Sequence, residues 1–461
     1  MIDIIIVGLY LCALLVIGIL KRNKGFNFTT LSKIRDKAKN NKFILVATIF
    51  ASSIGGGTTF GISEKAFSET LVNTYALLIA LPIDILIALY IVPKLARHYG
   101  AESIGDIMSY HYGKAGRYLG GVSAILVSIG LLSAQVSVSG RIFEYILNVD
   151  YLYGVIISYG IVLVYTTIGG LQSVLFTNLL QFLAMIFAIP VISIYGIHQI
   201  GFFEFINSIP KEKISFTANS ELLPMSIATA FAFALINLLP TFIQRTTLNK
   251  NSNITSSAVL IKTAIYAVFL IFVTINGLIA YVQYPEVKAS IALVHLIDHL
   301  IPTGLQGLVV VGLLAAVMST ADSDLNVLSI TLVNDIIKPN ISKISEHTML
   351  LIARIINVVM GSVSIIFAMC FSRVVDLVIF VVGFWSPLIL VPLVLSLFDI
   401  RISAKGLITS SLLGAISFLG WHLFFENMFY LRAILVGTAV NLIIFLLFYL
   451  SAKRTAKNIR H

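Results

Sequence analysis

The 461-residue chain is poor in cysteine, tryptophan and charge. Its two cysteines, Cys12 and Cys370, lie far apart in apolar segments, which excludes a disulfide framework and a cysteine-based zinc site. We expect both to be small buried hydrophobic residues. Only 11% of the residues are charged and 58% are hydrophobic, and this balance excludes an ordinary soluble globular protein.

Apolar runs of about 20 residues, the length that crosses a bilayer core, recur along the whole chain. We predict thirteen such helices and therefore an all-α polytopic membrane protein. The first run, residues 2–20, has no basic segment before it and is followed by Lys21, Arg22 and Lys24. We therefore expect it to remain as a membrane helix and not to be cleaved as a signal peptide.

The net charge of +10 comes from basic residues that are spread over short loops. A single basic face for nucleic acid is not expected from this spacing. Basic residues collect in cytoplasmic loops, so we predict that segments such as "KLARHYG", "GKAGR", "RISAKG" and the tail "AKRTAKNIRH" are cytoplasmic. This places the N-terminus outside and the C-terminus in the cytoplasm of a multi-pass protein of the cell (inner) membrane.

Two predicted spans are interrupted at corresponding places. The second span, residues 43–62, contains "ASSIGGGTTFG", and each glycine costs a helix about 1 kcal/mol relative to alanine. The seventh span, residues 223–243, contains Asn237 and Pro240. Each span opens a group of five helices, a pattern typical of inverted-repeat transporters that bind their solutes where the helices unwind. The predicted units are residues 1–42 with an extra helix and a basic loop, a ten-helix core at 43–398 with repeats at about 43–195 and 223–398, and residues 399–461 with two extra helices and a basic tail.

A polar stripe follows one face of the predicted helix "GLLAAVMSTADSDLNVLS", residues 312–329. It consists of Ala316, Ser319, Thr320, Ser323 and Asp324, which are spaced three and four residues apart. Isolated hydroxyls in membrane helices usually bond to the carbonyl four residues earlier. The density of this stripe instead favours a hard-oxygen site for a monovalent cation such as Na⁺, with backbone carbonyls from the broken helix as further ligands.

These residues resemble the sodium/solute symporter family. The similarity rests on "AAVMSTADSDLNVLS", on "YTTIGGLQSVLFTNLLQF" at residues 165–182, and on "SAQVSVSGRIFEYIL" and "FIQR" in the expected order, and it covers roughly residues 43–395. It implies a LeuT-type five-plus-five fold with one helix before it and two after it. It further implies a Na⁺ site formed by the backbone oxygens of Ala51, Ile54 and Ala316 and by the hydroxyls of Ser319 and Thr320.

The chain also departs from the pattern of that family. Where members commonly have an acid in a sequence like "WTD", this chain has "FTN" with Asn178. Ser53 stands where the proline transporters of the family have an acid. We hypothesise that Asp324, one helical turn beyond Thr320, supplies the charge on the ion exit path that Asn178 lacks. The alternative is that Asp324 only caps or solvates its helix.

Solute contacts are expected from the broken helices and the spans beside them. The candidates are Ser53, Thr58, Gln135, Asn237, Thr241 and Trp385, and each has packing as the alternative interpretation. Asp84 is also placed within the membrane, and the sequence leaves open whether it lines the solute cavity or has a structural role.

The favoured function is secondary active transport, in which Na⁺ as the coupling ion drives symport of a small organic solute into the cytoplasm by alternating access. No constellation of catalytic residues is present, so an enzyme is not expected. One alternative is a proton-coupled or uncoupled carrier of the same fold, which Asn178 favours. A solute-binding membrane sensor is the other, although the short tail offers no output domain. The expected partners are the solute, sodium and the lipid bilayer.

Overall fold

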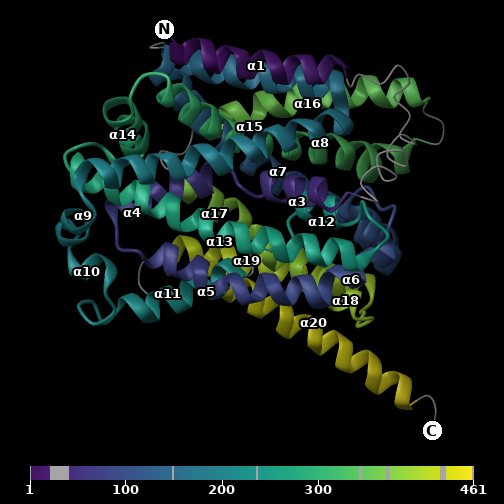
Figure 1. The fold of residues 1–461 in the computed structure, drawn as a ribbon. Helices are drawn as coiled ribbons and strands as arrows, with labels where there is room; N and C mark the ends of the chain where they lie inside the picture. The colour runs from purple at the N-terminus through teal and green to yellow at the C-terminus, as the bar shows by residue number, and fades with distance from the viewer. Residues whose placement is uncertain are drawn as a thin grey trace.

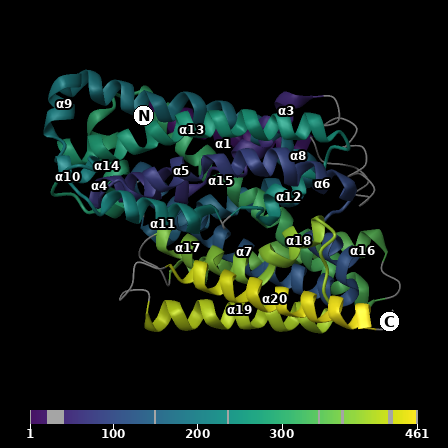
Figure 2. The ribbon, with the colours of Figure 1, turned by 90° about the horizontal axis from the view of Figure 1, so that it is seen from below.

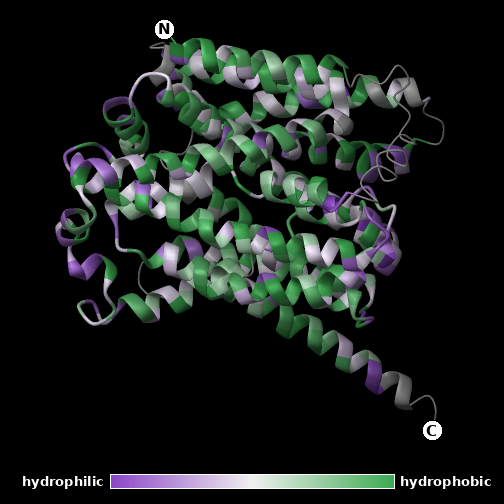
Figure 3. Cartoon of the chain, viewed as in Figure 1, coloured by the Kyte–Doolittle hydropathy of each residue, from purple (hydrophilic) through white to green (hydrophobic). Residues whose placement is uncertain are grey.

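The computed structural model describes residues 2–20, 41–147, 150–234, 237–341, 345–369, 374–425 and 432–458. Within these ranges the regular structure is entirely helical. The axes of most long helices are roughly aligned, and the two termini lie at opposite ends of the bundle (Figure 1). Figure 3 shows that the hydrophobic residues fill the middle of the long helices, while hydrophilic residues gather towards the two ends of the bundle.

Eleven helical stretches in the described part of the chain are long and apolar enough to cross a membrane. The long helices are α1 (Ile2–Leu20), α5 (Val72–Leu86), α7 (Ile104–Leu147), α8 (Tyr151–Ile200), α13 (Ser252–Gln283), α15 (Leu305–Thr331), α16 (Glu346–Ala368), α17 (Val374–Trp385), α19 (Ala404–Phe424) and α20 (Ala433–Asn458). Helix α8 holds two of the stretches, which are separated by a kink at Gly170. Shorter helices complete the fold: α6 (Val92–Leu95), α9 (Phe202–Ser208), α10 (Lys211–Ile214), α14 (Ala292–Leu300) and α18 (Val391–Leu397).

Two further segments are interrupted helices, as predicted. The first consists of α3 (Lys42–Ala51), a π-helical turn at Gly57–Gly61 and α4 (Ile62–Ser68). The second consists of α11 (Leu222–Ala234) and α12 (Pro240–Thr246). Together with the eleven continuous stretches they account for the thirteen predicted helical segments, whereas the predicted boundaries of the repeats stay a prediction.

Helix α15 forms the centre of the bundle, and nearly all of its residues are buried. It packs against α1, α7 and α8. Gly312 permits this close approach, because a Cβ at that position would lie 2.2 Å from the Cβ of Ala188. The polar stripe of α15 is therefore surrounded by protein instead of lipid.

Helices α19 and α20 pack against each other at one side of the bundle (Figure 2). They contact the π-helical segment Ser386–Leu390, where Asn441 donates a hydrogen bond to the carbonyl of Pro387.

Two expectations from the sequence concern the cysteines. Cys12 is exposed on α1, so the prediction that it is a buried hydrophobic residue is wrong, because α1 lies at the edge of the bundle. Cys370 lies outside the described residues.

Candidate functional site

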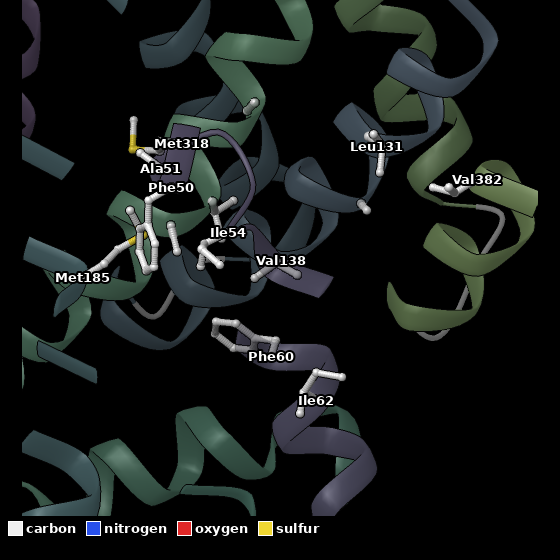
Figure 4. Packing of buried hydrophobic residues seen from close by; sticks show 14 of the residues in the cluster. Phe50, Ala51, Ile54, Phe60, Ile62, Leu131, Val138, Met185, Met318 and Val382 are labelled. Carbon is white, nitrogen blue, oxygen red and sulfur yellow. The ribbon is translucent and has the colours of Figure 1, made fainter. Parts of the chain in front are cut away.

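The first break lies at residues 52–55, between α3 and the π-helical turn. The amides of Ser53 and Ile54 both bond to the carbonyl of Phe50, at 2.9 and 3.1 Å, and the next regular bonds start at the carbonyl of Gly55. The carbonyls of Ala51 and Ile54 consequently accept no backbone hydrogen bond across the break and are available to other donors. Figure 4 shows the loop of chain that joins these two residues in the interior of the protein.

Two hydroxyls of α15 donate hydrogen bonds to these carbonyls. Ser319 Oγ lies 2.9 Å from the Ala51 oxygen and 3.1 Å from the Ala316 oxygen. Thr320 Oγ1 lies 3.0 Å from the Ile54 oxygen, 3.4 Å from that of Ala51 and 3.3 Å from that of Ala316. The structure thus brings together all five residues that the sequence analysis proposed as sodium ligands. Three carbonyls and two hydroxyls converge in a buried space, which is the donor set that a hard monovalent cation prefers.

The two residues of the predicted ion exit path lie on different elements. Asn178 of α8 donates from Nδ2 to Thr48 Oγ1 of α3 at 3.0 Å, and its Oδ1 is buried without a hydrogen-bond partner among the described residues. Asp324 lines the central cavity, and its Oδ2 likewise has no partner in the described part of the chain. Each residue therefore presents one buried oxygen that is open to a passing cation or water.

A third buried acid, Asp322, was not proposed as a site residue from the sequence. It accepts hydrogen bonds from Tyr165 at 2.9 Å and from Thr177, the neighbour of Asn178, at 3.4 Å. Ser323, beside it, accepts a bond from the fully buried Arg245 at 3.1 Å. The signal was present, because an acid within a membrane-spanning helix marks a functional position by default.

A cavity of about 250 Å³ opens beside these converging oxygens. It is lined by Ser53, Thr58, Gln135, Asn237 and Thr241, which are five of the six predicted solute contacts. Thr320 lines it too, so the candidate cation site and the cavity share a wall. A small pocket that is mostly apolar with a few convergent polar groups is the usual form of a solute site.

Some of these side chains also hold the broken helices in place. Gln135 accepts from the backbone N–H of Gly56 at 2.7 Å, which caps the second half of the first broken helix. The hydroxyl of Ser53 bonds back to the Ile49 carbonyl at 2.6 Å. Trp385 is absent from the cavity lining; it is fully buried and donates to the Asn237 carbonyl at 3.2 Å. The indole side chain of Trp385 therefore contacts the backbone of the second break.

The second break is built by proline and a strained leucine. Leu238 has a positive φ of 58°, Leu239 is extended, and Pro240 starts α12 at the first helical position, where its missing N–H is not needed. Asn237 bonds to the Ala234 carbonyl at 3.0 Å through Nδ2. Both breaks lie along the wall of the same cavity.

The wall of the cavity also holds an ion pair that the sequence did not reveal. Asp84 of α5 and Lys262 of α13 both line the cavity, with 3.2 Å between Nζ and Oδ2. Of the two roles left open for Asp84, the position on the cavity wall is therefore the one observed. Lys262 was missed because it lies among apolar residues of a span whose ends alone were expected to carry charge.

Comparisons with known proteins agree with this geometry. Residues 40–414 match the model of the sodium:solute symporter family. The sodium/pantothenate symporter of Escherichia coli (strain K12) is 23% identical over 408 residues, covering 82% of this chain and 84% of that protein. The sodium/glucose cotransporter 1 of Ovis aries is 22% identical and covers 80% of this chain, which spans 63% of the sheep protein.

Solved structures share the fold. A Na⁺-coupled sialic acid symporter in a substrate-bound, outward-open state superposes with a TM-score of 0.85 and 17% identity, covering 97% of this chain and 98% of that one. MhsT in complex with L-phenylalanine superposes with a TM-score of 0.55 and 16% identity, covering 90% of this chain and 99% of that one. These likenesses show the LeuT-type fold.

The cap on the first broken helix gives a test of this architecture. Gln135→Leu leaves the buried Gly56 N–H without an acceptor, which costs about 1–3 kcal/mol. We expect the melting temperature of the purified protein, measured without solute, to fall by several degrees. Ser133→Ala, on the same helix, removes only a hydroxyl that bonds to the Ile129 carbonyl and is expected to leave the melting temperature nearly unchanged. Equal melting temperatures for both variants contradict the capping role.

Proposed function

The chain belongs to the sodium:solute symporter family and is a Na⁺-coupled solute symporter, and from this premise we propose that its coupling ion binds where α15 meets the first broken helix. The observation that carries the proposal is the convergence of the Ala51, Ile54 and Ala316 carbonyls with the hydroxyls of Ser319 and Thr320. These groups carry no formal charge, so they balance a monovalent ion only partly. Binding of this kind is weak enough to allow release.

The geometry also supplies a coupling mechanism. A bound Na⁺ holds the break after α3 against α15, because oxygens of both elements coordinate it at once. The cavity shares Thr320 with the ion site, so an ion that fixes Thr320 also fixes part of the wall that the solute touches. Each ligand then raises the affinity for the other, as reciprocal linkage requires. Departure of the ion separates the elements and releases the solute.

The solute is a small organic molecule that occupies the cavity of about 250 Å³. Ser53, Thr58, Asn237 and Thr241 supply its polar contacts on the side of the breaks, and Gln135 contributes while it holds Gly56. Trp385 holds Asn237 in place by a hydrogen bond to its carbonyl. Alternating access follows from movement of the broken helices relative to α15, since hinges form where helical hydrogen bonds are already missing.

The ion site is tested with Na⁺ alone. Ser319→Ala removes one of five oxygen ligands, and a hydrogen-bonding group to a charge contributes about 1.5–3 kcal/mol. We expect the Na⁺ concentration for half-maximal thermal stabilisation to rise about 10-fold or more, with K⁺ keeping the ionic strength constant. Ser329→Ala, on the same buried helix with its hydroxyl bonded to the Asn326 carbonyl, serves as the control and is expected to behave like the parent chain. A parental Na⁺ response in Ser319→Ala contradicts the site.

The role of Asp324 on the exit path has its own test. Asp324→Asn removes a negative charge one helical turn from Thr320, so we expect Na⁺ to bind about fivefold more weakly in the same titration, equivalent to about 1 kcal/mol. Asp298→Asn, at a half-exposed acid on α14, is the control for the loss of one charge. An unchanged Na⁺ midpoint in Asp324→Asn leaves this acid as a structural residue.

We also propose that the end of the bundle with Lys94, Arg97 and Lys405 faces the cytoplasm, because basic loops stay on that side. Single cysteines at Lys453 and Lys288, introduced after removal of the two native cysteines, report the orientation in intact cells. A membrane-impermeant thiol reagent is expected to label position 288 and not position 453. The reverse labelling pattern overturns this orientation.

A further inference from the structure

The Asp84–Lys262 ion pair is set into the wall of the cavity, on α5 and α13 and not on the broken helices. The side chain of Lys262 is 10% exposed and that of Asp84 is 15% exposed, and both face the cavity. The described residues that contact the pair are Thr263, which donates to Asp84 Oδ2 at 3.4 Å, and Tyr266, whose ring centroid lies 5.1 Å from Lys262 Nζ. Burying two charges in a membrane protein costs desolvation free energy, so an ion pair at this position indicates a functional role.

The pair is only partly satisfied by protein groups. Both hydrogen bonds to Asp84 in the described part of the chain end on Oδ2, which leaves Oδ1 free to accept from a ligand. Lys262 has three N–H donors and uses one of them on Asp84, while the Tyr266 ring attracts the ammonium through its face. The wall thus presents an anionic acceptor and a cationic donor next to each other.

The charges around the cavity constrain the net charge of the solute. Asp84 and Lys262 line the cavity as an ion pair whose two charges cancel, so the pair leaves no net charge for the solute to balance. A solute with a net charge then adds an uncompensated charge to a low-dielectric interior, whereas a solute without net charge does not.

The rest of the lining decides between two kinds of solute without net charge. Most of the lining side chains are apolar: Ile62, Leu77, Leu81, Ile87, Phe233 and Phe242 are examples. A polyol has hydroxyls on all sides, and those that face this surface lose their hydrogen bonds to water without replacement. A zwitterion with an apolar body instead places both charges on the ion pair and its body on the apolar wall.

We propose that the Asp84–Lys262 pair binds the head group of a small zwitterion, its ammonium on Asp84 and its carboxylate on Lys262. Neutral amino acids with apolar side chains have this chemistry. The inference rests on the proposed function, because it assigns the solute class of the same cavity. It goes further in giving the charged head group a subsite on α5 and α13 and not at the helix breaks.

The test is a ligand panel on the purified full-length protein, with thermal stabilisation measured in saturating Na⁺. Leucine, phenylalanine and proline are each compared with the amine that lacks their carboxylate, the acid that lacks their amine, and glucose. We expect at least one amino acid to stabilise the protein at a concentration at least 10-fold below that of its amine, its acid or glucose. Stabilisation by glucose or by a one-charge analogue alone overturns the proposal.

Two variants locate the head group. Lys262→Met is expected to lose the preference for the zwitterion and to gain affinity for the amine, because Asp84 is left without its partner. Asp84→Asn is expected to shift the preference to the acid by the same reasoning. Lys213→Met is the matched control, since Lys213 is also a buried lysine beside a tyrosine ring but lies outside the cavity lining.

The outcomes separate this inference from the proposed function. If Na⁺ alone stabilises the protein but the amino acids do not, the ion site stands and the zwitterion subsite is wrong. If Na⁺ itself has no effect, the proposed ion site fails. If Lys262→Met does not fold, the ligand panel on the parent chain and Asp84→Asn still decide, and an amino acid preference unchanged in Asp84→Asn overturns the subsite.

Discussion

The contact between the free carbonyls of a broken helix and two hydroxyls of α15 is the constraint on which the rest of this structure depends. A helix interrupted in a membrane leaves backbone oxygens without donors, and hydrocarbon offers no replacement. Ser319 and Thr320 supply donors to Ala51 and Ile54, so the break is stable without an ion. A cation that enters this space replaces these hydrogen bonds, because the hydroxyl protons turn away and the hydroxyl oxygens join the carbonyl oxygens as ligands. The same oxygens thereby hold the break and α15 together either by direct hydrogen bonds or through a bound ion.

Around this contact the protein concentrates the polar groups that the membrane otherwise excludes. Asp322 and Asp324 lie on different faces of α15, Arg245 donates a hydrogen bond to Ser323 between them, and the Asp84–Lys262 pair lines the cavity. The acid that commonly stands in the "WTD" position is replaced by Asn178, yet Asp322 bonds to Thr177 in the same turn of α8. A carboxyl group thus faces this turn from α15, which is consistent with sodium coupling despite the substitution.

The sequence predicted the backbone architecture well, because the period of hydrophobicity and the loss of helix propensity are local properties. "SSIGGG" and "Asn237 to Pro240" marked both breaks, and the stripe from Ala316 to Asp324 marked the helix that faces them. Pairings between distant elements were out of reach. Nothing local to Lys262 indicates that Asp84 lies 3.2 Å away, and nothing local to Trp385 indicates that it contacts the Asn237 carbonyl instead of the cavity. The burial of Cys12 was misjudged because the edge position of α1 is set by packing of the whole bundle.

The most direct test of the central claim is an experimental structure of the protein in saturating Na⁺, compared with one in K⁺ alone. The account predicts density for an ion among the Ala51, Ile54 and Ala316 carbonyls and the two hydroxyls in Na⁺, and direct hydroxyl-to-carbonyl hydrogen bonds in its absence. Hydroxyls of Ser319 and Thr320 that remain bonded to those carbonyls in saturating Na⁺, with the ion bound elsewhere, contradict it.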